Sequence, residues 1–111
     1  MATLDDLLKI NGVVAAGEFT AAGALVDYKA KMEMSREMAA ITAQFCATVT
    51  MMFNTLAGGY AGMSKMNWVP QRGWMYAGGD YTVAIWGKRG VFVETAKADF
   101  NKLFEVLVGP R

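Results

Sequence analysis

The chain has 111 residues with no histidine and one cysteine, and its 11 basic and 10 acidic side chains leave a formal net charge of +1. This length predicts a single domain, residues 1–111, and the near-zero charge argues against a nucleic-acid partner. Without histidine the chain lacks the commonest general base and the commonest transition-metal ligand, so we expect no enzymatic activity, no metal and no cofactor.

The start of the chain predicts a short helix followed by a β-hairpin. Thr3 is a typical N-cap, and Gly12 is a typical stop signal after the apolar stripe of such a helix. Residues 13–20 and 24–28 are rich in strand-forming side chains, and the sequence TAAG that joins them ends in Gly23, which suits a tight reversal. We therefore expect two antiparallel strands here.

A long helix, three strands and a last helix are predicted in the rest of the chain. The charged segment KAKMEMSRE predicts a solvated connection to Ser35, the N-cap of the long helix, and the glycines of GGYAG predict its end. Strands are expected at 74–77, in YTVAIWG and in VFVETA, which together predict a meander. Asp99 is the predicted N-cap of a helix that Gly109-Pro110 closes. The element order is therefore α-β-β-α-β-β-β-α, which is an α/β (α+β) fold class.

The long helix carries no ionised side chain between Met38 and Ser64. Its length would suffice for a membrane span of about 20 residues. Polar side chains such as Gln44 and Asn54 lie within it, however, and each is costly to transfer into lipid. We therefore expect no membrane span, and instead a helix that is enclosed by protein on both sides.

Large and small side chains of this helix separate onto two faces at helical spacing. The large ones predict the face that packs on the sheet: Met38, Ile41, Phe45, Val49, Met52, Leu56 and Tyr60. The small, uncharged face predicts an interface with a second copy of the chain: Ala40, Ala43, Ala47, Thr50, Met51 and Asn54. A hydrophobic content of 54% also favours a covering partner, because the usual share is roughly 45–50%. The alternative is a helix buried wholly within one chain.

Three further features are candidates for chemistry. The segment GGYAGMSK is similar to a phosphate-binding loop, but it follows a helix and places Ser64 before Lys65, so a glycine-rich helix end is favoured. Cys46 lies among apolar residues, which predicts a buried structural thiol in a reduced, cytoplasmic protein. Aromatic and basic side chains combine in a candidate partner or ligand surface: Trp68, Arg72 and Trp74.

The element order and the opening LDDLLKINGVVAAGEFTAAGALVDY together resemble the roadblock family, which includes dynein light chains, bacterial gliding-motility regulators and endosomal scaffolds. Its pattern is carried by Leu7, Gly12, Val13, Gly23 and Leu25, and a small prokaryotic branch is the most similar. The resemblance implies a five-stranded antiparallel sheet with the long helix on one face and the two terminal helices on the other. It also implies dimers that pair through the long helix and the third strand, no shared catalytic residues, and in many members binding to small Ras-like GTPases.

Two functional hypotheses follow from these patterns. The first is a non-enzymatic homodimeric interaction module, acting on a small Ras-like GTPase or within a larger complex. The tryptophan-rich segment MNWVPQRGWMY departs from the GTPase-binding branches of the family. The second hypothesis is a small-ligand sensor with an apolar pocket lined by Trp68, Trp74 and nearby methionines.

Overall fold

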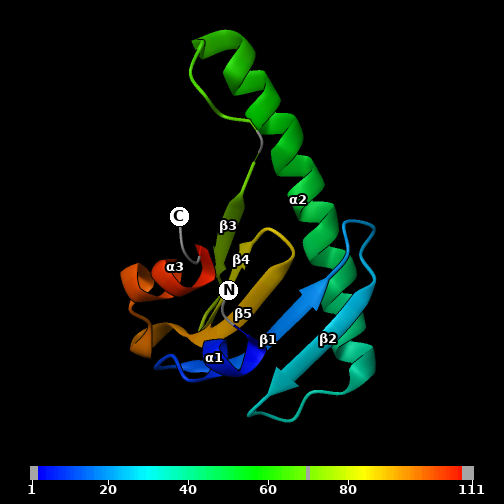
Figure 1. Ribbon diagram of the computed structural model, residues 1–111, viewed down its shortest axis with the longest axis vertical. Coiled ribbons are helices and arrows are strands. Elements are labelled where there is room, and N and C mark those ends of the chain that lie inside the picture. The colour runs from blue at the N-terminus through cyan, green and yellow to red at the C-terminus, as the bar shows by residue number, and fades with distance from the viewer. Residues whose placement is uncertain (1–2, 70, 109–111) are drawn as a thin grey trace.

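The computed structural model describes residues 3–69 and 71–108. A five-stranded antiparallel sheet forms the centre of the fold, with the strand order β2-β1-β5-β4-β3 (Figure 1). The predicted element order is confirmed, with one added 3₁₀ turn, and the elements are α1 (Leu4–Leu8), β1 (Val13–Phe19), β2 (Leu25–Ala30), α2 (Arg36–Ser64), β3 (Gly73–Ala77), β4 (Tyr81–Trp86), β5 (Arg89–Glu94), η1 (Thr95–Lys97) and α3 (Phe100–Val108). The predicted stop at Gly109-Pro110 lies outside the described residues.

The two faces of the sheet carry separate hydrophobic clusters. Because side chains alternate along a strand, Val91 and Val93 of β5 point to one face and pack with Leu7 of α1 and Leu103 of α3. Ile85 of β4 points to the other face and packs against α2. The terminal helices therefore cover one face and the long helix covers the other, as the roadblock resemblance implies.

Local hydrogen bonds explain where the helices begin. Thr3 and Asp6 form a reciprocal capping box at α1, since the Thr3 hydroxyl accepts from the Asp6 N–H and the Asp6 carboxylate accepts from the Thr3 N–H. The Ser35 hydroxyl accepts from the N–H of Met38 at 3.1 Å, and the Asp99 carboxylate accepts from the third residue of its helix at 3.1 Å. The three predicted N-caps are confirmed.

Two predicted boundaries are wrong. The segment KAKMEMSRE is a connection only after its first two residues, because β2 continues to Ala30 through backbone pairing with β1. The glycines of GGYAG do not end α2, which runs on to Ser64. Glycine weakens a helix by roughly 0.5–1 kcal/mol relative to alanine but does not break its hydrogen-bond ladder. The helix ends where Lys65 takes the left-handed conformation, with φ of 59°.

The assignment of faces on α2 is also wrong. The small side chains pack on the sheet, where Ala43 is 4% exposed and Ala47 is 8% exposed. The large ones point away from the core, and Phe45 is 70% exposed. A close approach explains this orientation, because a Cβ on Gly23 in the β1–β2 turn would lie 3.1 Å from the Cα of Gln44 and 3.4 Å from the Cβ of Ala47. Small side chains are needed wherever the helix lies this close to the hairpin.

Candidate interaction site

An exposed apolar surface runs along α2. We call the seven large side chains of this helix the bulky flank: Met38, Ile41, Phe45, Val49, Met52, Leu56 and Tyr60. Val49 is half-buried and the other six are exposed. The β1–β2 turn covers the helix at Ala47 instead. Of the residues predicted for the dimer interface, Ala43 and Ala47 belong to the core of this chain, Ala40 and Thr50 are half-buried, and Met51 and Asn54 are exposed.

The two edges of the sheet differ in charge. Strand β2 forms one edge and carries the charged residues Asp27 and Lys29. Strand β3 forms the other edge, has the uncharged sequence GWMYA and exposes the side chains of Met75 and Tyr76. Charges on an edge strand discourage pairing with another chain, and their absence leaves the edge available. The β3 edge is therefore the one suited to extension by a further strand.

The length and composition of α2 alone would allow it to cross a membrane. Its most apolar 18-residue window has a mean hydropathy of 1.2, and 22% of that window is buried within the chain. One such helix is weak evidence, because helices that pack in the core of a protein pass the same test. Here Ala43, Cys46 and Ala47 pack on the sheet of the same chain, so no clear membrane span emerges.

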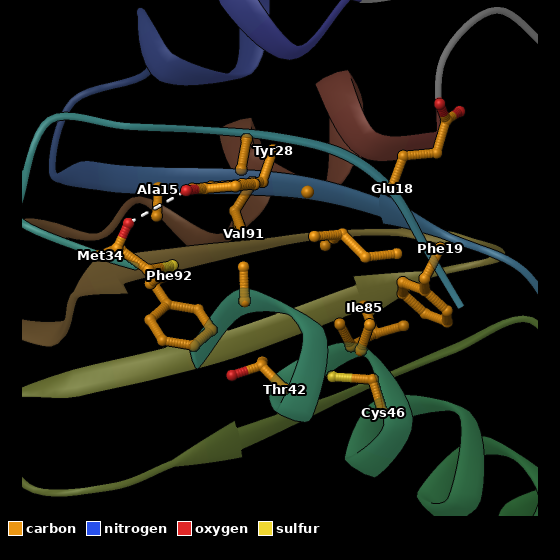
Figure 2. Close-up of a pocket in the computed structure, with 16 residues that line it drawn as sticks. Ala15, Glu18, Phe19, Tyr28, Met34, Thr42, Cys46, Ile85, Val91 and Phe92 are labelled. Atoms are coloured by element: carbon orange, nitrogen blue, oxygen red, sulfur yellow. Dashed lines mark hydrogen bonds between the residues drawn. The ribbon is translucent and has the colours of Figure 1, made fainter. Parts of the chain in front are cut away.

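A small apolar cavity of about 50 Å³ lies between the sheet and the N-terminal half of α2 (Figure 2). The hydroxyl of Tyr28 donates to the backbone oxygen of Met34 at 3.1 Å at its margin. The lining is almost wholly apolar, so the gap offers a water few hydrogen-bond partners. The cavity is therefore a packing gap and too small for a metabolite.

Cys46 lies beside this cavity and is a poor nucleophile. Its side chain points toward Ile85 of the sheet (Figure 2), and the residue is buried. Burial in apolar surroundings disfavours the thiolate and raises the pKa of the Cys46 thiol from its ordinary value of 9.0 to about 11. The predicted buried thiol is confirmed.

A larger cavity of about 340 Å³, open to solvent, lies where α2 extends past the sheet, and Arg72 and Trp68 at its margin are exposed. The structure brings together here the candidate residues Trp68, Arg72 and Trp74, and it adds residues that the sequence analysis missed: Phe53, Leu56, Ala57 and Tyr60 from α2, Gln71 and Gly73 before and in β3, and Trp86 from β4. No methionine is among the described residues that line the cavity, so the predicted methionine lining is wrong. The helical spacing of Phe53, Leu56 and Tyr60 indicates that these side chains share one side of α2. Nothing in the sequence shows that the segment between α2 and β3 folds back onto them. We call this space the tryptophan cavity.

Polar chemistry elsewhere is sparse in the part of the chain that the structure describes. No group of three or more acidic or cysteine side chains comes together there that could hold a metal ion. The ion pairs join exposed side chains, such as Lys29 Nζ with Asp5 Oδ2 at 2.8 Å, and the hydrogen bond and charge of Asp5 raise the pKa of Lys29. Such pairs are typical of a solvated surface and contribute little to stability.

The comparisons with known proteins agree with this fold. The profile of the family described as "Uncharacterized conserved protein (DUF2173)" matches residues 3–108. Among solved structures, the chain is similar to the "Crystal Structure of Roadblock/LC7 Domain from Streptomyces avermitilis", with a TM-score of 0.72, 12% identity, and coverage of 95% of this chain and 85% of that chain. No curated protein matches the sequence. The roadblock fold expected from the sequence is thereby confirmed.

Proposed function

Since the chain belongs to the family described as "Uncharacterized conserved protein (DUF2173)", we propose its function from the structure: it is a non-enzymatic protein-interaction module that acts as a homodimer. The roadblock fold supports a role in protein interaction or regulation. The observation that carries the proposal is the exposed bulky flank of α2, on the same side of the sheet as Tyr76 of the uncharged edge strand β3.

The bulky flank is too apolar to be an ordinary solvated helix face. Phe45 is 70% exposed and Met52 is 67% exposed. Burial of one such side chain contributes roughly 1.5–3 kcal/mol, so a partner that covered several of them would gain substantially. Contiguous exposed apolar surface on a small protein commonly marks an interaction site.

A second copy of the chain fits this surface better than an unrelated charged partner. No side chain between Met38 and Ser64 is ionised, so two copies of the flank meet without repulsion between like charges. An antiparallel pair of β3 edges about a two-fold axis satisfies the free backbone groups of both strands. We therefore assign the dimer interface to the bulky flank, in place of the residues Ala43 and Ala47, which are buried within the chain.

The proposal also includes a partner other than the second copy of the chain. The resemblance to the roadblock family suggests a small Ras-like GTPase or a larger complex, and the cytoplasm is the expected location. The dimer would present the charged β2 edge, with Asp27 and Lys29, at its two outer ends. Co-purification of the tagged dimer with a GTPase of the native organism is the measurement that tests this part.

Light scattering coupled to size-exclusion chromatography tests the dimer. The expected mass at micromolar concentration is twice the chain mass of 12.0 kDa. Phe45→Glu should give a folded monomer, because it places a charge in the bulky flank. Gln44→Glu is the matched control, since Gln44 is the exposed neighbour beside the β1–β2 turn. A monomeric unmodified chain, or a Phe45→Glu variant that stays dimeric, would contradict the proposal.

Small-ligand binding is a second candidate function, and one observation favours it. The tryptophan cavity has a volume of about 340 Å³, which falls within the ~300–1,000 Å³ typical of ligand pockets. The cavity shares Leu56 and Tyr60 with the bulky flank, so it adjoins the proposed dimer interface.

A further inference from the structure

The tryptophan cavity lies beneath a projecting part of the molecule. The C-terminal half of α2 extends beyond the sheet, and the chain returns from it to β3 (Figure 1). Two hydrogen bonds hold the returning segment in place: the N–H of Gln71 donates to Asn54 Oδ1 at 3.2 Å, and the N–H of Gly87 donates to the Arg72 oxygen at 2.8 Å. Gln71 and Arg72, which line the cavity, are therefore anchored to α2 and to the β4–β5 turn.

Five of the ten residues that line the cavity carry aromatic rings. The chain has three tryptophans, and Trp68, Trp74 and Trp86 all line this space. Trp68 packs against Tyr60 with ring centroids 5.0 Å apart. Trp74 packs against Phe53 at 5.9 Å. Rings held by such pairs present fixed flat faces, which suit the stacking of a planar ligand.

The indole of Trp86 reaches the cavity because Gly73 has no side chain. Trp86 belongs to the face of the sheet that α3 covers, where it packs edge-on against Phe104 at 5.7 Å. A Cβ on Gly73 would lie 2.5 Å from Trp86 Cε3, so the indole occupies the space that a side chain would need. The cavity thus combines residues from both faces at the end of the sheet.

Two polar side chains of the cavity, Gln71 and Arg72, bring hydrogen-bond donors to it. Gln71 lines it, and its buried Nε2 has no hydrogen-bond partner among the residues that the structure describes. Arg72 also lines it and forms no ion pair with the acids that the structure describes. No acidic residue is among the lining residues. A buried donor left without a partner destabilises a protein by about 1–3 kcal/mol, so a ligand acceptor here would be favoured.

We propose that the tryptophan cavity binds a small planar aromatic carboxylic acid. The ring of the ligand stacks on the indole faces, and its carboxylate accepts hydrogen bonds from the Gln71 amide and pairs with the guanidinium of Arg72. The cavity volume of about 340 Å³ lies near the lower end of the ligand-pocket range, which favours one or two fused rings over a nucleotide. This inference rests on the small-ligand function proposed above and does not require the dimer.

Nuclear magnetic resonance titration tests the proposal directly. The three indole N–H signals of the ¹⁵N-labelled protein all report on the cavity, and indole-3-acetate is the probe, with indole and acetate as separate controls. Saturable shifts of the three signals by indole-3-acetate, weaker binding of indole and no effect of acetate are expected. Equal affinity for indole and indole-3-acetate would overturn the role of the carboxylate, and no saturable shift at millimolar probe would overturn the site.

Two variants separate the pairing with Arg72 from a general charge effect. Arg72→Gln should weaken the binding of indole-3-acetate by about fivefold or more and leave indole binding unchanged. Lys88→Gln removes the same charge from the exposed β4–β5 turn outside the cavity and should have no effect. Equal weakening by both variants would contradict the proposal.

The monomeric variant distinguishes this inference from the dimer proposal. Phe45 does not line the tryptophan cavity, so the Phe45→Glu chain should bind the probe as the unmodified chain does. Binding to the Phe45→Glu chain alone would show that a second copy fills the cavity, which would overturn the ligand proposal while supporting the dimer. Binding by an unmodified chain that proves to be monomeric would leave the ligand site intact and remove the dimer.

Discussion

The indole Nε1 of Trp74 donates a hydrogen bond of 2.8 Å to the hydroxyl of Thr50. This contact joins the edge strand β3 to α2, the two elements that the proposed dimer uses. It also fixes the Trp74 ring in the wall of the tryptophan cavity. The predicted interface residue Thr50 therefore acts within one chain, as an acceptor for the strand.

Thr50→Val should lower the free energy of unfolding by about 1 kcal/mol or more, because it leaves the partly buried indole N–H without a protein acceptor. Thr48→Val is the matched control. The Thr48 hydroxyl is exposed and donates only to the backbone oxygen of Gln44 in its own helix, so a change within ~0.5 kcal/mol is expected. Urea denaturation measures both, and equal effects would show that the Trp74 contact contributes nothing.

Ala47→Arg should destabilise the monomer fold itself. Ala47 is 8% exposed and its Cβ lies close to Gly23, so an arginine must either displace the hairpin turn or bury a charge. The expected loss in unfolding free energy is about 3 kcal/mol or more. Gln44→Arg, on an exposed site one turn earlier, should change stability little. An Ala47→Arg variant that keeps its stability and only loses a partner would support the original assignment of faces.

The parts of the fold that were predictable from the sequence depend on local chemistry. Caps such as Thr3, Ser35 and Asp99 are set by hydrogen bonds within a few residues, and the strands by runs of branched and aromatic side chains. The orientation of α2 depends on no such signal. A helix without charges offers no polar contrast between its faces, and the choice was decided by the space beside the sheet, where only side chains such as Ala43 fit.

The candidate site was predictable only in part, for a related reason. Trp68, Arg72 and Trp74 stand out because they are close in sequence and combine aromatic rings with a charge. Their partners come from elsewhere in the chain, and Trp86 reaches them only because Gly73 has no side chain. Contacts between distant segments of this kind follow from tertiary packing, which a pattern in one segment does not encode.

Cys46 should react slowly with Ellman's reagent. Its pKa is raised from 9.0 to about 11, so at pH 8 the thiolate is about 100-fold scarcer in the folded chain than in the unfolded chain, and restricted access slows the reaction further. The comparison is the rate at pH 8 with and without denaturant. Because the folded state favours the neutral thiol, this contribution to stability is complete below pH 9 and is lost as the pH rises through about 11. Equal rates in the two states would show that the thiol is exposed.

Gly73→Ala should damage the end of the sheet and the tryptophan cavity together. The new Cβ would lie 2.5 Å from the backbone oxygen of Ile85 and 2.5 Å from Trp86 Cε3. The backbone oxygen cannot move without breaking the β3–β4 pairing, so the unfolding free energy should fall by about 1–3 kcal/mol. The Trp86 indole N–H signal should also shift, because its ring is displaced. Gly79→Ala is the matched control, since no atom lies within 4 Å of its Cβ position, and neither effect is expected there. A Gly73→Ala chain with unchanged stability would show that the indole and the strand are not in contact as described.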